Sequence, residues 1–506
     1  MSSKALRRFT PALAALGLAA CAVSPEPFSH VQLQTMSMGF STRVTADQEP
    51  VSGTISLYEA MARALKYNLD FKVEVMQTAL RSSELRLSHY NLLPNAVVQS
   101  GYSSRDSYLS TGELNLTNGK TTAPRTTSSE KNNTVSDITF SWNILDFGLS
   151  YIHARQSADK VLIAEEARRK VVHKIIEDVR SAYWRAVSSD RMVTKLKGLE
   201  ARTRTALNNA RSLAHSQETS PITALTYERE LIEIKRAAQE LQRELSIAKT
   251  QLAALMNLPP DSSFGLSAEG LNAAAPLIGL DPHDMIDAAL MNRPELRDVA
   301  YQRRINEHEA HAALLELLPG LQLYGGDNYD TNKYLAHGEW VTWGAKASWN
   351  VVKVFQYPAK RRVIEGQDAL LDARALALTM AVMTQVHVSN IRYMNASKEL
   401  VTAREYFDVQ SRLVKQMRSE ATAERISEQT LIREELNTLV AEVKRDIAFA
   451  SAQNAFATIY TSVGLDPHAS DVSTTMSVSE LSQNLRGLWL ERGDFNGHAK
   501  ISLASR

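Results

Sequence analysis

The chain has 506 residues and a formal net charge of +1, so it lacks the basic excess typical of nucleic-acid-binding proteins. Its 21 glycines and 15 prolines are few for this length, which favours long uninterrupted helices over a loop-rich enzyme. After the first 20 residues no run of about 18 apolar residues occurs, so a membrane crossing is expected only as strands of a closed barrel.

The first residues have the pattern of a secretory signal. Lys4, Arg7 and Arg8 form a positive region, and the apolar stretch 11–20 that follows is too short to span a bilayer as a helix. Residues 1–20 are therefore expected to be a signal peptide. The stretch ends in Leu-Ala-Ala followed by Cys21, which resembles the bacterial lipobox.

The lipobox resemblance implies that Cys21 is the first residue of the mature chain and carries covalent lipid, with acyl chains such as palmitate. Cys21 is the only cysteine, so it has no partner for a disulfide within the chain. Ala22 implies sorting to the outer membrane. An ordinary signal peptide followed by a chance cysteine is the alternative.

The next residues predict one series of elements. Residues 21–54 are rich in Pro, Ser and Thr and are expected to form an extended anchor segment. The first repeat, 55–258, is expected to contain helices over 55–67, 71–92, 149–213 and 221–256 and a strand over 135–146 that follows a polar segment.

The same series is predicted again after a linker at 259–280. The second repeat, 281–465, is expected to contain helices over 282–292, 295–317, 359–420 and 426–462 and strands over 321–330 and 339–352. Landmarks recur in order: Leu92-Leu93-Pro94 as Leu317-Leu318-Pro319, and Ser141-Trp142-Asn143 as Ser348-Trp349-Asn350. The period is far too long for a solenoid repeat, so a half of the protein is duplicated. Residues 466–506 are a polar tail.

The strands have the clearest local pattern. Apolar and polar residues alternate around Phe140 and Trp142, and again around Trp343 and Trp349. A strand with lipid on one side and water on the other requires this alternation. A half-buried strand of a soluble sheet has the same alternation and remains the alternative.

Two strands per repeat give four per chain, which is too few to close a barrel. Open edges inside hydrocarbon would leave backbone groups without hydrogen bonds, so closure requires several chains. A helix of about 60 residues reaches about 90 Å, so the long helices must project into aqueous space.

On these residues the chain resembles the TolC outer-membrane efflux family, in its lipoprotein branch. The resemblance covers 55–465 and rests on the paired Leu-Leu-Pro and Ser-Trp-Asn landmarks and on the repeat ends at Asn257-Leu258 and Gly464-Leu465. It implies an α+β membrane protein that forms a homotrimer. Long helical hairpins form a periplasmic α-barrel, and four strands from each chain build a 12-stranded β-barrel in the outer membrane.

The resemblance also implies the function and the partners. The trimer would be an exit duct that works with a periplasmic adaptor and an inner-membrane transporter. It would export small molecules such as drugs and toxic compounds, or proteins as in type I secretion. The expected lipid-facing strand residues are Phe140, Trp142, Trp343 and Trp349.

The breaks between the long helices are expected to form the periplasmic tip. The residues expected to dock the adaptor are Ala214, His215, Ser216, Ala421, Thr422 and Ala423. The residues expected at a pore gate are Ser220, Thr223, Glu424, Ser427, Glu428 and Thr430. The glycine usual in the family's turn is absent here, and the constricting aspartates of the family fall near the uncharged Ser427 and Thr430. Helix capping by Ser220 and Ser427 is the alternative role.

Other classes of function have weaker support. A periplasmic coiled-coil lipoprotein without a pore, serving as a spacer or adaptor, would share the anchor and the helices but not the alternating strands. His308 and His311 are three residues apart on a helix, but no third ligand is identifiable, so no metal site is expected. Without a phosphate loop or nucleophile elbow, neither an enzyme nor a cofactor is expected.

Overall fold

The computed structural model describes residues 25–46, 48–51, 53–112, 114, 116–120, 126–215, 220–259, 262–271, 281–423, 425–466 and 476–493. The predicted signal peptide, Cys21, Ser216 and Glu424 lie outside these residues.

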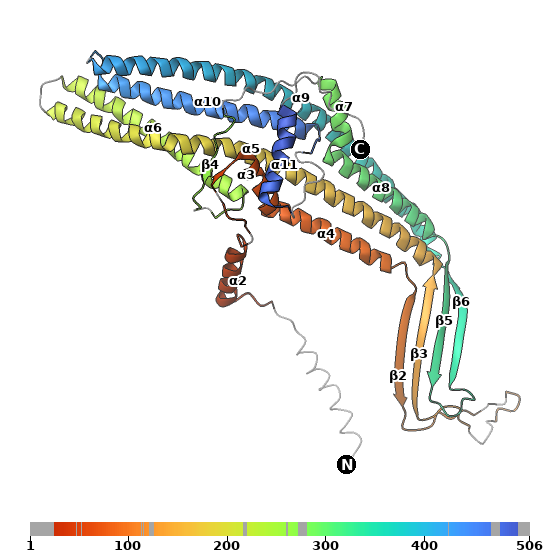
Figure 1. Ribbon diagram of the computed structural model, residues 1–506. Coiled ribbons are helices and arrows are strands. Elements are labelled where there is room, and N and C mark those ends of the chain that lie inside the picture. Colours follow the sequence, from red (N-terminus) through yellow and green to blue (C-terminus); the bar gives the residue numbers. More distant parts are fainter. Residues whose placement is uncertain are drawn as a thin grey trace.

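The described chain contains one series of elements twice, which confirms the predicted duplication (Figure 1). The first copy comprises α3 (Leu57–Tyr67), α4 (Leu69–Tyr90), β2 (Asn95–Ser104), β3 (Asn132–Asn143), α5 (Ile144–His215) and α6 (Pro221–Leu255). The second comprises α7 (Pro282–Asn292), α8 (Pro294–Leu315), β5 (Gly320–Asp330), β6 (Glu339–Ser348), α9 (Val352–Thr422) and α10 (Glu428–Ser462). Counterparts match closely in length: α4 and α8 have 22 residues each, and α6 and α10 have 35 each.

The four strands form one antiparallel sheet in the order β2-β3-β5-β6. The central pair joins the two copies, with Thr139 opposite Gly326. Two strands, β2 and β6, therefore lie at the edges of the sheet. β2 follows α4 in the chain, and β6 precedes α9, so each edge strand continues into a helix on its own side.

The helices next to the sheet follow the order of the strands. Near the sheet α4 packs on α5, α5 on α8, and α8 on α9. Beyond the middle of the molecule α6 packs on α5, α5 on α10, and α10 on α9. The protomer thus has two sides along its whole length: a first side made of β2, α4 and α6, and a second side made of β6 and α9. Figure 1 shows the sheet at one end and the two long helical hairpins at the other.

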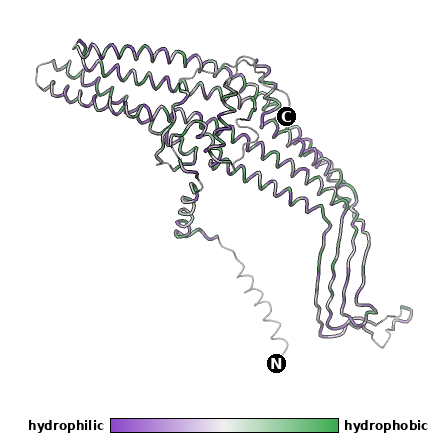
Figure 2. Tube along the Cα trace, in the orientation of Figure 1, coloured by the Kyte–Doolittle hydropathy of each residue, from purple (hydrophilic) through white to green (hydrophobic). Residues whose placement is uncertain are grey.

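Two groups of buried residues hold the helices together. The larger one lies around the middle of the molecule, where the Trp184 ring contacts Tyr183 and Phe449 edge to face, with ring centroids 5.2 and 4.8 Å apart. The smaller one lies between α5, α6 and α10 and includes Met192 and Leu231. Figure 2 shows hydrophobic residues along the full length of the long helices, as expected for helices that pack side by side.

Smaller elements gather around the middle of the molecule. β1 (Thr54–Ile55) pairs in parallel with β4 (Gly265–Leu266). The Tyr183 hydroxyl shares its one proton between the carbonyls of Ile55 (3.0 Å) and Ser267 (2.6 Å), which fixes this pair on α5. These contacts join the segment before the first copy to the segment after it.

Two further helices differ from the sequence predictions. Within 21–54, predicted to be extended, α2 (His30–Arg43) is a helix with a complete capping box formed by Ser29 and Gln32. Within the polar tail, α11 (Val478–Gly493) is a helix that packs on α3. Its Trp489 lies under the Arg180 guanidinium at 4.3 Å.

Helix α9 corrects one further prediction, that no helix after the signal could cross a membrane. Among the described helices, α9 alone contains an 18-residue stretch apolar enough for that, and only 17% of the stretch is buried. The criterion of an uninterrupted apolar run missed it, because the apolar residues of α9 are interspersed with polar ones. At 71 residues, or about 107 Å, α9 is far longer than a bilayer is thick.

Candidate functional site

One face of the sheet is mostly apolar across all four strands, with Asp327 on β5, between Ile138 and Val341, as an acidic exception. Directly opposite residues of an antiparallel pair share a face, so the register places Phe140 in one row with Ala96 on β2 and Gly325 on β5. The apolar residues of this face are Ala96, Val98, Ile138, Phe140, Trp142, Leu321, Leu323, Val341, Trp343, Ala345 and Ala347. The predicted positions of Phe140, Trp142 and Trp343 on one apolar face agree with this register.

The other face is polar. Its polar residues include Asn95, Gln99, Asp137, Thr139, Ser141, Gln322, Asn328, Thr342 and Lys346. Where the sheet meets the helices, this face continues into an open pocket of about 390 Å³ lined by Asn95, Ser141, Asn143, Gln322 and neighbouring residues. A sheet with one apolar and one polar face separates an apolar environment from an aqueous one.

An aromatic ring covers a glycine on the polar face. Tyr324 on β5 lies directly opposite Gly344 on β6, and a Cβ at position 344 would lie 2.6 Å from the Tyr324 hydroxyl oxygen. The ring therefore occupies the space above the glycine, an arrangement that pins strand register. The sequence contains both residues, but only the register brings them together.

Trp349 corrects a sequence prediction, because it lies outside the strand. β6 ends at Ser348, and the Trp349 indole Nε1 donates a 2.9 Å hydrogen bond to the carbonyl of Leu317. Leu317 lies between α8 and β5, so the indole ties the start of α9 to the turn before β5. The alternation in the sequence continues past the strand end, which is why the pattern alone extended β6 too far.

Both sides of the protomer expose apolar stripes. On α4 the exposed residues recur at spacings of three, four and seven: Leu69, Val73, Met76, Leu80, Leu87 and Tyr90. On α9 the exposed apolar residues include Val363, Leu370, Leu376, Met380, Ile391, Met394 and Val401. Exposed apolar area of this extent on both sides is typical of a protein that packs against further chains.

The last residues of α5 and α9 and the first residues of α6 and α10 lie at the end opposite to the sheet (Figure 1). Ala214 and His215 are the last residues of α5, and Ala421 and Thr422 are the last of α9, followed by Ala423. α6 begins at Pro221 and α10 at Glu428, so long helices end and begin on either side of both predicted breaks. Residues 216–219 and Glu424 lie outside the described residues.

The residues predicted for a gate have mixed local roles. The Ser427 Oγ accepts a 3.2 Å hydrogen bond from the Thr430 backbone N–H, so Ser427 caps α10. Ser220 occupies the corresponding place before α6 but makes no capping hydrogen bond through its side chain. Thr223 and Glu428 are exposed in the first turns of α6 and α10.

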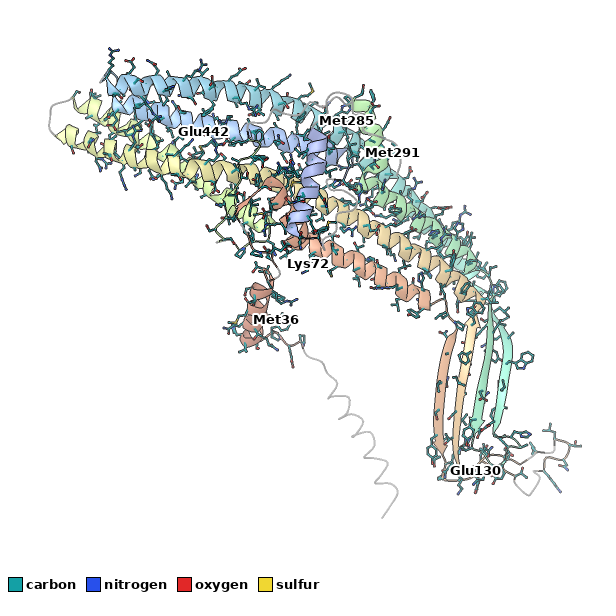
Figure 3. The ribbon with its side chains drawn as sticks, viewed as in Figure 1. Met36, Lys72, Glu130, Met285, Met291 and Glu442 are labelled. Carbon is teal, nitrogen blue, oxygen red and sulfur yellow. The ribbon has the colours of Figure 1, made fainter. Side chains whose placement is uncertain are left out.

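Buried acidic residues tie α10 to α5. The Arg191 guanidinium donates to Glu442 Oε1 (2.9 Å) and Asp446 Oδ2 (3.0 Å), and Lys195 Nζ donates to Glu442 Oε2 (2.7 Å). Figure 3 labels Glu442 among the long helices. A third acid, Glu435, binds Arg202 on α5 and Arg418 on α9. Charged contacts thus link three of the long helices at intervals.

His308, considered above as a metal ligand, lies buried between α8 and α5. Its Nε2 is 3.8 Å from Asp159 Oδ2, and Asp159 also binds Arg304. Burial lowers the pKa of His308, and the charge of Arg155 lowers it further. Among the described residues no group of three or more His, Cys, Asp or Glu side chains has metal-binding geometry.

A second charged cluster fixes the end of α10. The Arg169 Nε donates to Asp466 Oδ1 at 3.0 Å, and His173 Nε2 lies 3.3 Å from the same oxygen. Burial alone would raise the pKa of Asp466, but the hydrogen bond of His173 and the charge of Arg169 outweigh it and lower the pKa to about 2.

Comparison with known proteins identifies the architecture. No protein-family model and no curated protein matches the sequence. Solved structures do match. The outer-membrane channel MtrE of Neisseria gonorrhoeae, in its open state, superposes with a TM-score of 0.62 at 14% identity over 83% of this chain and 94% of MtrE. The outer-membrane channel CmeC of Campylobacter jejuni superposes with a TM-score of 0.60 at 12% identity over 92% of this chain and 97% of CmeC.

A third structure agrees with these two. CusC superposes with a TM-score of 0.60 at 13% identity over 83% of this chain and 96% of CusC. The alignments thus cover nearly the full length of each channel and most of this chain. The chain therefore has the TolC-like outer-membrane channel fold that its repeats predict.

Proposed function

We propose that three copies of this chain form an outer-membrane exit duct. The observation that carries the proposal is the four-stranded sheet, with one apolar face, one polar face and two unpaired edge strands. In a membrane those edges must be paired, and β2 of one copy can pair with β6 of the next. Twelve strands then close a barrel with Phe140 and Trp343 toward lipid and Ser141 and Thr342 toward water.

The helices support the same ring. The first side of a protomer (β2, α4 and α6) meets the second side (β6 and α9) of its neighbour along the whole length. The exposed stripe on α4, with Val73 and Met76, then packs against the exposed stripe on α9, with Leu370 and Met380. Burial of apolar surface on this scale is a large favourable term in association.

In this proposal the duct continues below the membrane as a cylinder of twelve long helices. A periplasmic adaptor contacts the tips formed by the α5–α6 and α9–α10 turns, and an inner-membrane transporter supplies the energy. MtrE and CmeC are outer-membrane channels, which supports the assignment to the outer membrane. The cargo is small molecules or proteins.

Cys21 is proposed to carry the lipid anchor, because it ends the lipobox-like sequence and is the sole cysteine. Mass spectrometry of the N-terminal peptide should find it acylated. A free thiol, or a mature chain that begins elsewhere, would refute the anchor without affecting the channel. Cys21→Ser should impair membrane attachment more than pore formation.

Single-channel recording in planar bilayers tests the duct. The purified protein should give stepwise conductance, and native mass spectrometry in mild detergent should give a trimer. Protein that binds vesicles through its lipid without conductance, and that stays monomeric, would instead support the periplasmic lipoprotein without a pore.

A further inference from the structure

Helix α2 stands apart from the rest of the described chain. All 14 of its residues are exposed, and it packs on no other helix or strand to any appreciable extent. Figure 3 labels Met36 on this helix, away from the helical body. The exposed apolar residues on and beside it are Phe28, Val31, Leu33, Met36, Met38, Phe40 and Val44.

A lone helix of this length needs a partner. Isolated helices shorter than about 12–15 residues are marginal in water, and the capping box of α2 adds only a modest gain. Seven exposed large apolar side chains on one short segment mark a surface that another molecule covers.

The hydrogen bonds that attach α2 show on which side of the protomer the molecule that covers it must lie. Asn257 follows the end of α6, and its Nδ2 donates a 2.6 Å hydrogen bond to the carbonyl of Val44, just after α2. Gln48 Nε2 also donates to the Asn257 carbonyl. Because α6 belongs to the first side of the protomer, the C-terminal end of α2 is attached where the second side of a neighbouring copy lies in the proposed ring.

A lipid surface does not fit as the cover. Asn68 Nδ2 donates to the carbonyl of Leu255 at 3.4 Å, so the start of α4 is level with the end of α6. From there α4 needs 22 residues, about 33 Å, to reach the sheet. The 14 residues of α2 span about 21 Å, so even a helix directed at the membrane ends short of the apolar band.

The neighbour's α7 offers a matching surface at the same level. α7 packs on α9, and its end touches the end of α10, where Gly464 lies against the Asn292 backbone. Gly464 is the counterpart of Asn257 in the duplication, so α7 and the attachment point of α2 lie at one height. Met291 on α7 is 56% exposed.

The charges of the two helices are complementary. Asp284 and Asp287 are exposed on α7, and neither forms an ion pair within the part of the chain that the structure describes. α2 contains no acidic residue and ends in the exposed Arg43, which likewise forms no ion pair there.

We propose that α2 of each copy packs on α7 of the neighbouring copy and so clamps the seam between them. The inference rests on the proposed ring of copies and adds to it a contact outside the barrel. Apolar residues of α2, Met36 among them, cover Met291, and Arg43 pairs with Asp284 or Asp287.

Two single-cysteine substitutions in separate chains test this directly. One chain carries Met36→Cys and one tag, the other carries Met291→Cys and a second tag, and both are co-expressed. Mild oxidation should give a disulfide-linked heterodimer with both tags, in about ten-fold excess over a control pair, because docking raises the effective concentration of the two thiols. The control pairs Met36→Cys with Asp106→Cys, which lies beyond the far end of the strands. Both pairs retain Cys21, so its contribution cancels.

Charge exchange gives a second measurement. Asp284→Arg together with Asp287→Arg in the Met291→Cys chain should lower the heterodimer yield, and Arg43→Asp in the other chain should restore it. A trimer by native mass spectrometry without excess heterodimer would overturn the clamp and leave the duct intact. Loss of the trimer itself would count against the duct. Cross-links from Met36→Cys only to other envelope proteins would also overturn the clamp.

Discussion

Asn257 and Gly464 occupy the same place in the two copies, and both have a positive φ, 57° and 78°. Each ends the returning helix of its hairpin: the N–H of the next residue donates to a carbonyl five residues back, Leu258 to Ala253 and Leu465 to Tyr460. Each copy of the duplicated fold thus requires a residue with a left-handed backbone conformation after its returning helix. That residue is asparagine in the first copy and glycine in the second.

The two positions should respond differently to substitution. Gly464→Ala should lower the free energy of unfolding by about 2 kcal/mol or more, since a side chain at positive φ costs about 1–2 kcal/mol. The added Cβ would also lie 2.7 Å from the Asn292 carbonyl carbon. Denaturant unfolding followed by circular dichroism measures the change. Asn257→Gly is the matched control, and its free energy of unfolding should stay within about 1 kcal/mol of the wild type. Glycine adopts a positive φ without strain, and this gain offsets the lost hydrogen bond to Val44.

The two faces of the sheet should tolerate charge differently. Phe140→Arg and Ala347→Arg place a cation on the apolar face near the helical end of the sheet. The cost of a lipid-facing cation is about 2–4 kcal/mol at the bilayer midplane and falls to about 0–1 kcal/mol at the interfaces, so we expect about 1 kcal/mol or more at each of these positions. Ser141→Arg and Ser348→Arg, one residue further along on the polar face, should fold and change only the conductance. Heat-stable trimer yield and single-channel recording separate these results. Equal tolerance on both faces would mean that these strands do not lie in a membrane.

The ion pairs of the buried acids on α10 should contribute more to stability than ion pairs on the surface. Arg191→Ala removes a cation that contacts both Glu442 and Asp446, and the loss should be about 1–3 kcal/mol because the acids remain buried. Arg243→Ala breaks an exposed pair with Glu240 and should cost less than about 0.5 kcal/mol. Thermal unfolding of the two variants in detergent provides the comparison; similar midpoints would contradict it.

The cluster around Asp466 predicts a dependence on pH. The pKa of Asp466 is about 2 in the folded protein against an ordinary 3.8, so folding favours the ionised form. Its contribution to stability is full above about pH 4 and is lost as pH falls towards 2. Asp466→Asn should therefore flatten the stability curve in that window and leave its shape above it unchanged. A curve as steep as that of the wild type would show that other carboxyls dominate.

The tip should affect export but not assembly. Ala421→Trp or Ala423→Glu should abolish adaptor-dependent export while trimer yield stays unchanged, because Ala421 lies in the last turn of α9 and Ala423 directly follows the helix. Ser246→Trp, an exposed position on α6 away from the tip, is the control and should export normally. Export that survives the tip substitutions would remove this end from the docking site.

The elements that could be predicted from the sequence are those whose signal is local. The long helices and β3 and β6 follow from their own periodicity, and the predicted repeat ends at Asn257 and Gly464 coincide with the positive-φ residues. β2 is the expected second strand of the first repeat, but the sequence pattern gives it no bounds, because adjacent Val97 and Val98 break its alternation and its pairing with β3 decides its conformation. The contact between Tyr324 and Gly344 likewise depends on the register of β5 and β6, which the sequence pattern does not give.

Two helices have start signals in the sequence, although the segments that contain them lack a helical apolar pattern. Ser29 with Gln32 before α2, and Ser477 with Glu480 before α11, are spaced as capping boxes and mark helix starts. Neither segment has a strong apolar period, since α2 gains nothing from its own chain and α11 is fixed by packing on α3. The charged ties of α10, such as Arg191 with Glu442, join residues far apart in sequence that no spacing reveals.

Because both edges of the sheet are unpaired within one chain, each chain in the proposed ring depends on both of its neighbours. A subunit whose β6 cannot pair, as after Thr342→Pro, still offers an intact β2 and therefore enters a ring that it cannot complete. In a cell that makes equal amounts of both chains, only about one ring in eight would contain three sound subunits. Such alleles should therefore be dominant-negative, and residual export in a mixed population would follow the cube of the wild-type fraction.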